Sequence, residues 1–417
     1  MKRLLALAVV AALPLTACGS GAKSDKSEMS GKSQQVTLTF WNGYTGPDRP
    51  ALEALVKKFN DTHPGVRIEM TIMTWDVLFQ KLLPAFTSGN GPDLVAFDDA
   101  HIARFAARGV LAPLDDWYTE ERKATLVKPA VEATVFKGKH YAVPMTFTPI
   151  LMYYNKKLFK DAGLNPAKPP ATWQEWQAAL KKLTKDADGD GRPEQYGIAL
   201  PDHQTIQVWP ILLWGNGGDL LSLGSPQSVQ AVRQWSDLIV KDRISPTGLG
   251  GADADKLFQT GKAATDITGP WMTTGFEEAG LDFGVAMVPA GPAGPVTLAG
   301  ASSFVLNAEA GAAEQKAAGE WFTFWNSKQS QIEWSNGSGF PGVRTDVTPA
   351  DTKANPYVAQ FAAHSEKARV LLPGQAEFRK IYEEIFEPAV QRVTTGKTPA
   401  PQALDEAAEA IKAVTGP

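Results

Sequence analysis

Apolar and polar residues alternate over 36–40 and 66–72, and between these segments apolar residues recur every three or four positions from Leu52 to Phe59. Alternation is typical of a strand with one buried face, whereas the longer period predicts an amphipathic helix. After a turn at Gly91-Pro92, the continuous apolar run Leu94–Phe97 predicts a strand that is buried on both faces. This order of elements predicts an α/β fold with parallel strands, whose carboxyl ends lie along one edge.

Aromatic and acidic side chains follow each of these predicted strands. Trp41 comes after the first strand, Trp75 after the second, and Asp98 and Asp99 directly after the third. Ligand sites in open α/β sheets lie outside the carboxyl ends of the strands, so we expect these residues to line one cleft. The alternative for the two aspartates is that they only cap a helix.

The middle of the chain contains extended segments that meet at prolines. Residues 141–148 and 150–154 are joined at Pro149 without an intervening helix, and 285–289 and 297–306 form a second pair. We interpret each pair as a crossing between two lobes, near residues 146 and 289. A chain of 417 residues exceeds the size at which one core usually keeps growing, which also favours two lobes.

Helix signals complete this pattern. Asp48 is placed to cap the helix that contains Leu52, and Thr172 with Glu175 fits a capping box. Residues 196–200 predict a further strand. The last part of the chain is predicted to be mainly helical, over 308–327, 329–336, 356–364, 378–394 and 400–414.

One loop carries a metal-binding pattern. Asp186, Asp188 and Asp190 occupy positions one, three and five of an EF-hand loop, and Gly191 occupies position six. The glutamate expected at position twelve is replaced by Gly197, so calcium would need another carboxylate. We therefore keep two interpretations open, a Ca²⁺ site and a plain Asp/Gly turn, and expect no other cofactor.

The N-terminus has the features of a processing segment. Lys2 and Arg3 precede an apolar stretch, 4–13, that is too short to span a bilayer. The only cysteine, Cys18, follows directly, and Leu15–Gly19 resembles a bacterial lipobox, in which the cysteine receives a diacylglyceryl group. We expect residues 1–17 to be a lipoprotein signal peptide, and polar residues 18–35 to be a lipid anchor and tether outside the cytoplasmic membrane.

Composition narrows the possible functions. Charged residues make up 21% of the chain and the net charge is −4, which argues against a nucleic-acid partner. HExxH, GxSxG and P-loop motifs are absent from the sequence, which argues against the enzyme classes that these motifs mark. A secreted glycosidase is the alternative, because cleft aromatics with paired acids also suit glycoside hydrolysis.

Tryptophans either fill cores or stack on ring-shaped ligands, and we assign three of the 12 to the core: Trp173, Trp209 and Trp321.

Several motifs in order resemble one family, the extracellular solute-binding proteins of ABC importers, in the group with maltose, multiple-sugar and glycerol-3-phosphate binders. The motifs are Leu38-Thr39-Phe40-Trp41, Gly91-Pro92-Asp93-Leu94, Tyr153–Phe159, Gly269-Pro270-Trp271, Leu298–Ser302 and Thr395–Pro399. The resemblance implies a periplasmic-binding-protein type II fold, like that of maltose-binding protein, with two α/β lobes around a hinged cleft. It implies an N-terminal lobe of residues 36–146 plus 289–342 and a C-terminal lobe of 147–288 plus 343–417.

The resemblance also implies a function and a set of contacts. We expect a monomer that captures a sugar by lobe closure and delivers it to a membrane permease. Carboxylates would accept hydrogen bonds from hydroxyl groups, and aromatic faces would cover the C–H side of a pyranose. The implied ligand contacts are Trp41, Asn42, Tyr44, Trp75, Phe97, Asp98, Asp99, Thr146, Trp214, Trp271, Gly300, Ala301 and Arg379.

Arg379 leaves the ligand open. It stands where maltose binders place a stacking tryptophan and where the glycerol-3-phosphate binder places an arginine. The side chain can contact a phosphate, hydrogen-bond to hydroxyl groups, pair with Asp98 or Asp99, or lie in solvent. A glycerol-3-phosphate or glycerophosphodiester binder is therefore the alternative to a sugar binder.

Overall fold

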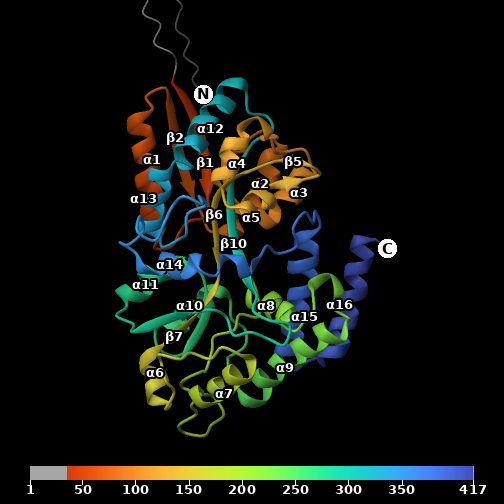
Figure 1. The fold of residues 1–417 in the computed structure, drawn as a ribbon. Helices are drawn as coiled ribbons and strands as arrows, with labels where there is room; N and C mark the ends of the chain where they lie inside the picture. Colours follow the sequence, from red (N-terminus) through yellow and green to blue (C-terminus); the bar gives the residue numbers. More distant parts are fainter. Residues whose placement is uncertain (1–34, 417) are drawn as a thin grey trace, which may run out of the picture. The chain divides into compact units, whose positions relative to one another are not determined.

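The computed structural model describes residues 35–416 (Figure 1). The predicted signal peptide, Cys18 and the tether up to residue 34 lie outside the described residues. Within 35–416, none of the helices is long and apolar enough to cross a membrane.

The larger sheet contains the strands predicted near the N-terminus. Its order is β11-β10-β3-β1-β2, and β6 also pairs with β10. β1 is parallel to β2 and β3, as predicted, whereas β10 is antiparallel to β3 and β6. The carboxyl ends of β1, β2 and β3 therefore lie along one edge. The strands are β1 (Val36–Asn42), β2 (Val66–Ile72), β3 (Leu94–Asp98), β6 (Val143–Pro149), β10 (Thr297–Leu306) and β11 (Ala368–Arg369).

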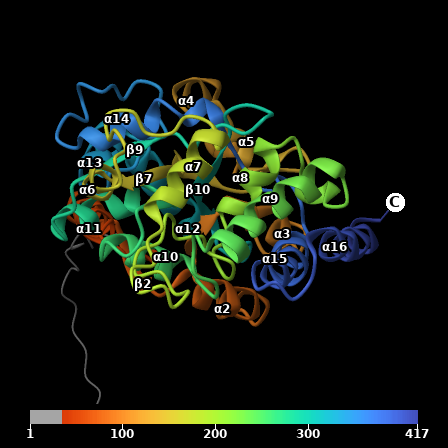
Figure 2. The ribbon, with the colours of Figure 1, turned by 90° about the horizontal axis from the view of Figure 1, so that it is seen from below.

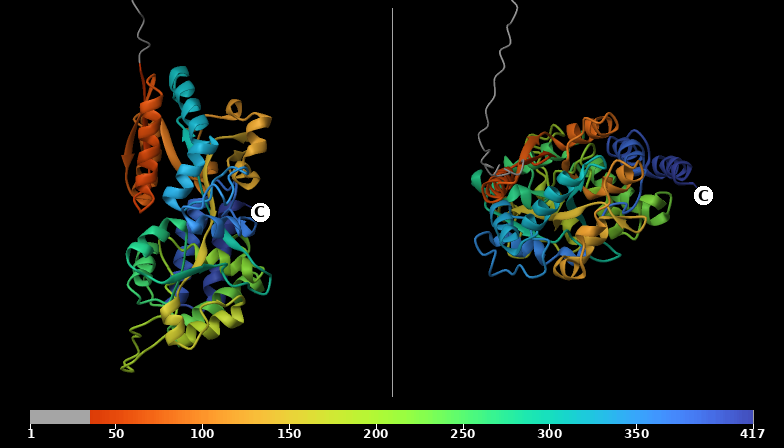
Figure 3. Two further views of the ribbon diagram at one scale, coloured as in Figure 1. Left: turned by 60° about the vertical axis from the view of Figure 1, so that its left-hand side comes forward. Right: turned by 90° about the horizontal axis from the view of Figure 1, so that it is seen from above.

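Helices cover both faces of this sheet. α1 (Arg49–Thr62), α12 (Ala312–Trp325) and α13 (Lys328–Ser338) pack on one face, and Figure 3 shows α1 in red-orange beside α12 in cyan. α2 (Trp75–Thr87) and α3 (Ile102–Ala106) pack on the other face. Successive residues of β3 alternate between the two apolar clusters, which is why its sequence is a continuous apolar run. Short elements follow α3, namely α4 (Glu120–Thr125), α5 (Lys128–Ala133), β4 (Val135–Phe136) and β5 (Lys139–His140).

The smaller sheet is antiparallel, with the order β8-β7-β9. Its strands are β7 (Leu151–Asn155), β8 (Thr265–Thr268) and β9 (Phe283–Ala286). In Figure 2, four of the helices beside it lie together, namely α8 (Val208–Gly215), α9 (Pro226–Asp242), α15 (Glu387–Thr394) and α16 (Ala400–Thr415). The remaining helices of this part are α6 (Lys156–Asp161), α7 (Trp173–Leu183), α10 (Gly251–Gln259), α11 (Thr273–Glu278) and α14 (Pro356–Ala362).

Two connections join the sheets where the sequence predicted crossings. β6 continues into β7 across Ile150, and residues 287–296 connect β9 to β10. The lobe boundaries that the resemblance implied stay a prediction, because the chain from Gln35 onward forms one compact unit.

Some predicted elements differ from the observed ones. Asp48 stands at the N-cap of α1 but its side chain accepts no capping hydrogen bond, because its backbone is α-helical rather than extended. Residues 196–200 form only isolated bridges, since the backbone of this segment bonds alternately to residues near 244 and to β8. The predicted helix 378–394 instead has a π-helical turn, Lys380–Phe386, before α15, where Pro388 cannot donate a backbone hydrogen bond.

Two further comparisons concern helices. The capping box of Thr172 and Glu175 is confirmed at the start of α7. α2 has no counterpart among the predicted elements, because Pro84 in its interior is a helix-breaking signal. Its stripe of Leu78, Leu82 and Phe86 nevertheless packs against the sheet, and this packing outweighs the missing hydrogen bond.

Candidate functional site

One cavity lies at the carboxyl ends of β1, β2 and β3. Its volume is about 720 Å³, within the range of small-molecule sites. Residues of the larger sheet and its loops form one wall, and residues around β8, α10 and the π-helical turn form the rest. The two parts of the fold thus contribute to a single site.

The wall from the larger sheet carries stacked aromatic rings. The ring of Tyr44 meets the ring of Trp75 edge-on at 5.5 Å between centroids, and Trp75 stacks on Phe79 at 6.0 Å. Gly43 permits this arrangement, because a Cβ at that position would lie 2.1 Å from the Trp75 ring. Trp75 therefore presents an aromatic surface to the cavity.

Asp98 and Asp99 stand beside these rings at the end of β3. The Oδ1 atom of Asp98 accepts a hydrogen bond from the N–H of Ala100 at 2.9 Å, which starts a 3₁₀ turn, Asp99–His101. The capping interpretation is thus correct for Asp98, but its side chain also opens into the cavity. Because protein atoms surround this opening, burial raises the pKa of Asp98 to about 6.

Asp99 is more enclosed than Asp98. Its side chain is buried, and its Oδ1 atom has no hydrogen-bond partner within residues 35–416. Burial, together with the neighbouring charge of Asp98, raises the pKa of Asp99 well above its usual value. His101 lies next along the wall, with its ring 4.0 Å from that of Phe79, and burial lowers its pKa to about 3. His101 is therefore neutral at neutral pH.

The opposite wall contains Trp271, whose position depends on a close backbone approach. A Cβ at Gly269 would lie 2.0 Å from the Trp271 ring, so only glycine fits there. The ring lies 5.8 Å from that of Phe340 and also packs near Gly300. Trp271 is partly exposed and lines the cavity.

Asp255 and Asp266 lie in the same wall and were not among the predicted site residues. Asp255 belongs to α10 and Asp266 to β8, and both line the cavity. Burial raises the pKa of Asp255 to about 6, and burial together with the charge of Asp255 raises the pKa of Asp266 well above its usual value. The sequence contains one signal for this site, because Asp266 is the one charged residue of the short segment Thr265–Thr268. In the structure this segment is β8, and all of its residues are buried.

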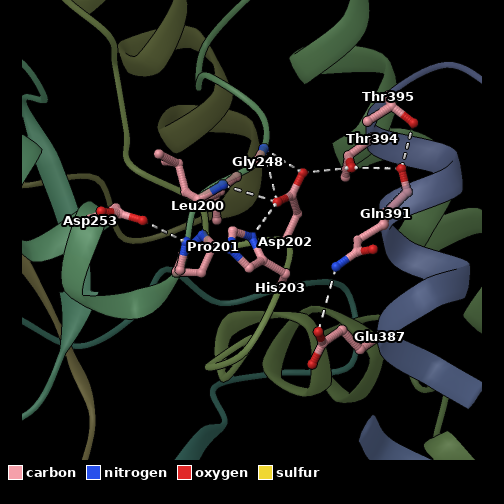
Figure 4. Close-up of polar contacts among 12 residues, drawn as sticks. Leu200, Pro201, Asp202, His203, Gly248, Asp253, Glu387, Gln391, Thr394 and Thr395 are labelled. Atoms are coloured by element: carbon pink, nitrogen blue, oxygen red, sulfur yellow. Dashed lines mark hydrogen bonds and ion pairs between the residues drawn. The ribbon is translucent and has the colours of Figure 1, made fainter. Parts of the chain in front are cut away.

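A buried carboxylate holds the loops of this wall in place. Asp202 accepts hydrogen bonds from the N–H of Gly248 at 3.0 Å and from the Oγ1 of Thr394 at 2.9 Å (Figure 4). These bonds tie the loop after residue 200, the loop before α10 and helix α15 together. The positions of Gln204 and Glu387, which line the cavity, follow from this attachment.

Arg379 lies at another end of the cavity. Its Nε atom is 3.3 Å from a carboxylate oxygen of Glu383 and 3.4 Å from one of Glu384, so it pairs within its own segment and not with Asp98 or Asp99. The side chain is half-exposed, and such pairs contribute only about 0–1 kcal/mol.

Four of the predicted contact residues do not line this cavity. Phe97 is fully buried between β3 and α2, because alternation along the strand directs it away from the face of Ala96. Trp41 packs partly on the same cluster, and buried Asn42 accepts a hydrogen bond from the N–H of Tyr44 at 3.2 Å. Trp214 lines a different cavity of about 620 Å³. These four residues lie away from the cavity, whereas the other predicted positions line it: Tyr44, Trp75, Asp98, Asp99, Thr146, Trp271, Gly300, Ala301 and Arg379. Contact with a ligand stays a prediction for all of them.

Buried polar atoms without a partner gather around the cavity. A buried donor or acceptor that is left unpaired costs about 1–3 kcal/mol, so such atoms are usually paired with water or a ligand. Within residues 35–416, the unpaired atoms on the cavity wall are Tyr44 Oη, Asp99 Oδ1, His101 Nδ1, Thr146 Oγ1, Asp266 Oδ2 and Tyr382 Oη. The cavity is suited to a small molecule with several polar groups.

The loop of Asp186 lies outside the cavity. Carboxylate oxygens of Asp186, Asp188 and Glu194 lie within 4.8 Å of one another, so Glu194 rather than Asp190 completes the group. Asp190 instead accepts a hydrogen bond from the N–H of Arg192 at 2.7 Å. The oxygen ligands suit Ca²⁺, and calcium binding at this loop stays a prediction.

Comparisons with known proteins agree with this architecture. Residues 54–360 match the family described as bacterial extracellular solute-binding protein. A maltooligosaccharide ABC transporter solute-binding lipoprotein of Streptococcus pneumoniae is 30% identical over 70% of this chain and 68% of its own length.

Solved structures have the same fold. An ABC transporter solute-binding protein from Thermotoga lettingae, bound with α-D-tagatose, is 27% identical with a TM-score of 0.80, over 92% of this chain and 100% of that one. The maltose/maltodextrin-binding domain from Bdellovibrio bacteriovorus, bound to maltotriose, has a TM-score of 0.80 and 23% identity, over 91% of this chain and 100% of that one. The fold is therefore that of the maltose-binding proteins, as the resemblance implied, and the chain belongs to the family of bacterial extracellular solute-binding proteins.

Proposed function

We propose that this protein is the substrate-binding component of an ABC importer and captures a sugar outside the cytoplasmic membrane. The observation that carries the proposal is the group of unpaired buried polar atoms around one cavity that also contains aromatic rings. Sugars combine closely spaced hydroxyl groups with apolar C–H faces, so they match both features. The related proteins named for a maltooligosaccharide and bound to α-D-tagatose or maltotriose support the same class of ligand.

The two walls have complementary parts in this proposal. Trp75 at the start of α2 and Trp271 after β8 both line the cavity, and each can cover one face of a sugar ring. Asp98, whose pKa of about 6 leaves it mainly charged at neutral pH, accepts charge-assisted hydrogen bonds from hydroxyl groups, and Asp99 offers its unpaired Oδ1 atom as an acceptor. A ligand that contacts both walls stabilises the closed arrangement. Residues 36–146 with 289–342 and 147–288 with 343–417 are the proposed lobes.

Attachment to the membrane is a second part of the proposal. Residues 1–17 would be removed and Cys18 would carry the lipid, which would keep a monomeric binding protein close to its permease. Cys18→Ser should abolish incorporation of radioactive fatty acid and release the protein from the membrane fraction. Incorporation that persists in this variant would contradict the anchor.

The rival functions have less support. A phosphate-bearing ligand such as glycerol-3-phosphate would meet an acidic cavity, and Arg379 already pairs with Glu383 and Glu384. Catalysis is not part of the proposal, and we expect no hydrolysis of oligosaccharides. Release of reducing ends with turnover would instead favour a glycosidase.

A ligand screen tests the proposed function. The protein without its N-terminal segment is heated with mono-, di- and trisaccharides, with glycerol-3-phosphate and with glycerophosphodiesters. A sugar at 100 times its Kd should add about 2.7 kcal/mol to the free energy of unfolding and raise the Tm. Stabilisation by the phosphate compounds alone, or by none of the compounds, would contradict sugar binding.

A further inference from the structure

Carboxyl groups dominate the charge of the cavity. The basic side chains that line it are Arg104 and Arg379, and both lie near the π-helical turn. The acidic side chains that line it are Asp48, Asp76, Asp98, Asp99, Asp255, Asp266, Glu383 and Glu387. Of these acids, Glu383 is the one that forms an ion pair within residues 35–416.

Asp266, the most enclosed of these groups, lies beside the partly buried Asp255. Asp266 is 1% exposed, and its Oδ2 atom accepts no hydrogen bond from an N–H or hydroxyl group of the described residues, so the carboxyl group of Asp255 is its polar neighbour. Asp255, on α10, is the acidic neighbour of Asp266, and its charge raises the pKa of Asp266. Thr268 also approaches Asp255, and Tyr153 of β7 lies close by, with its hydroxyl donating to the carbonyl of Gly269 at 2.8 Å. No lysine or arginine within residues 35–416 forms an ion pair with either aspartate.

We infer that the solute is a sugar that carries a protonated amino group, and that Asp255 and Asp266 bind this ammonium group at the cavity wall. The inference rests on the proposed function and narrows its ligand class. Buried charges in proteins are normally paired, and here the described side chains supply no cation. The partner of the pair must then come from the ligand.

An ammonium group explains the pair better than a hydroxyl group does. A hydroxyl would satisfy the free Oδ2 atom but would leave the negative charge of the pair uncompensated in an enclosed site. An ammonium group offers three donors and a positive charge, and the Trp271 ring on the same wall can add a cation–π contribution. The acids Asp98 and Asp99 on the other wall also favour a cation.

Binding of an ammonium group should release a proton. Without ligand, burial disfavours the charged form of both carboxyl groups and so favours a proton shared by the pair. When the ammonium group binds, the shared proton leaves to solvent and the second carboxylate becomes charged. Affinity for an amino sugar should therefore fall as the pH falls from 7 to 5, by up to about tenfold per pH unit.

Titration calorimetry with matched sugars tests the inference. The probes are glucosamine, galactosamine and mannosamine, each with its N-acetylated and its hydroxyl counterpart, in two buffers of different ionisation enthalpy. We expect the free amine to bind about 10- to 100-fold more tightly than its counterparts, as for a hydrogen bond between charged groups, and to release a proton.

The outcomes separate this inference from the proposed function. If a hydroxyl or N-acetylated sugar binds as tightly as its amine, the amino group is not recognised and the proposed sugar binding stands. If no sugar in this series or in the oligosaccharide screen binds, both the inference and the proposed function are wrong.

Two variants locate the binding group. Asp255→Asn and Asp266→Asn should each lower the affinity ratio of the free amine to its hydroxyl counterpart by about tenfold and remove the proton release. Asp405→Asn is the control, because Asp405 is exposed on α16 and outside the cavity. An unchanged preference in both cavity variants would overturn the assignment to this pair. If a variant fails to fold, the pH profile of the unmodified protein decides, and an affinity that does not fall between pH 7 and 5 contradicts the inference.

Discussion

The Asp255–Asp266 pair makes the stability of the ligand-free protein depend on pH. In the unfolded chain Asp266 loses its proton near its usual value of 3.8, whereas in the folded protein its pKa is well above that value. Between the unfolded and the folded pKa, the folded state therefore binds up to one more proton than the unfolded state. Stability from this group is fully present at low pH and is lost as the pH rises through the folded pKa.

The size of the effect follows from this difference of one proton. The free energy of unfolding should fall by about 1.4 kcal/mol for each pH unit between the unfolded and the folded pKa of this group. Solvent screening does not reduce the effect much, because Asp266 is only 1% exposed. The other acids of the cavity also make stability depend on pH. They do so in the variant and in the unmodified protein alike, so the difference in stability between the two reports on Asp266.

Asp266→Asn removes this dependence without removing the side chain. The amide oxygen can still accept the bond that Oδ1 receives from the N–H of Ile267 at 2.8 Å, and the amide group can donate to Asp255. We expect the stability of the variant relative to the unmodified protein to rise with pH, by up to about 1.4 kcal/mol per pH unit until the folded pKa of Asp266 is reached.

Urea unfolding of the ligand-free protein at several pH values measures this difference. Asp405→Asn, an exposed substitution on α16, controls for the loss of one negative charge and should leave the pH dependence unchanged. If Asp266→Asn is less stable than the unmodified protein at pH 7, or if the difference does not vary with pH, the raised pKa of Asp266 is refuted.

Three further predictions concern other parts of the molecule. Trp271→Ala should weaken sugar binding by about tenfold and change the free energy of unfolding by less than about 1 kcal/mol. Trp235→Ala, in the core, should instead lower the free energy of unfolding by about 3–5 kcal/mol. Calorimetry measures the affinity and urea unfolding the stability, and an equal loss of stability in the two variants would contradict the assignment of Trp271 to the cavity. Millimolar calcium should raise the Tm of the protein but not that of Asp188→Asn, and an equal shift in both would place the calcium elsewhere. Arg379→Ala should change the free energy of unfolding by less than about 1 kcal/mol, because its ion pairs are half-exposed, and a larger loss in urea unfolding would show that they stabilise the fold.

The strands were the most predictable part of the fold. The observed bounds of β2 and β10 are the predicted ones, since both depend on apolar patterns that are local in the chain. The ordered motifs also identified the family, and the junction of β3 with Asp98 and Asp99 marked one wall of the cavity. Local pattern was enough for these features, because the carboxyl ends of parallel strands meet at one edge.

Local signals were misleading where packing outweighs them. Pro84 marks a helix break, yet α2 continues through it because an apolar stripe packs against the sheet. Residues 196–200 have the composition of a strand but bond to two different parts of the chain. Propensity describes a segment alone, whereas the observed element also depends on its neighbours.

The sequence by itself determined the family, the α/β fold and the strand end at Asp98, because periodicity and motif order are written along the chain. Only the tertiary structure decided which side chains face the cavity. It placed Phe97 in the core and Trp214 in another cavity, and it brought Asp255 of α10 to Asp266 of β8. A side chain's direction and its partners from other elements depend on how helices and sheets pack, and no spacing along the chain specifies that packing.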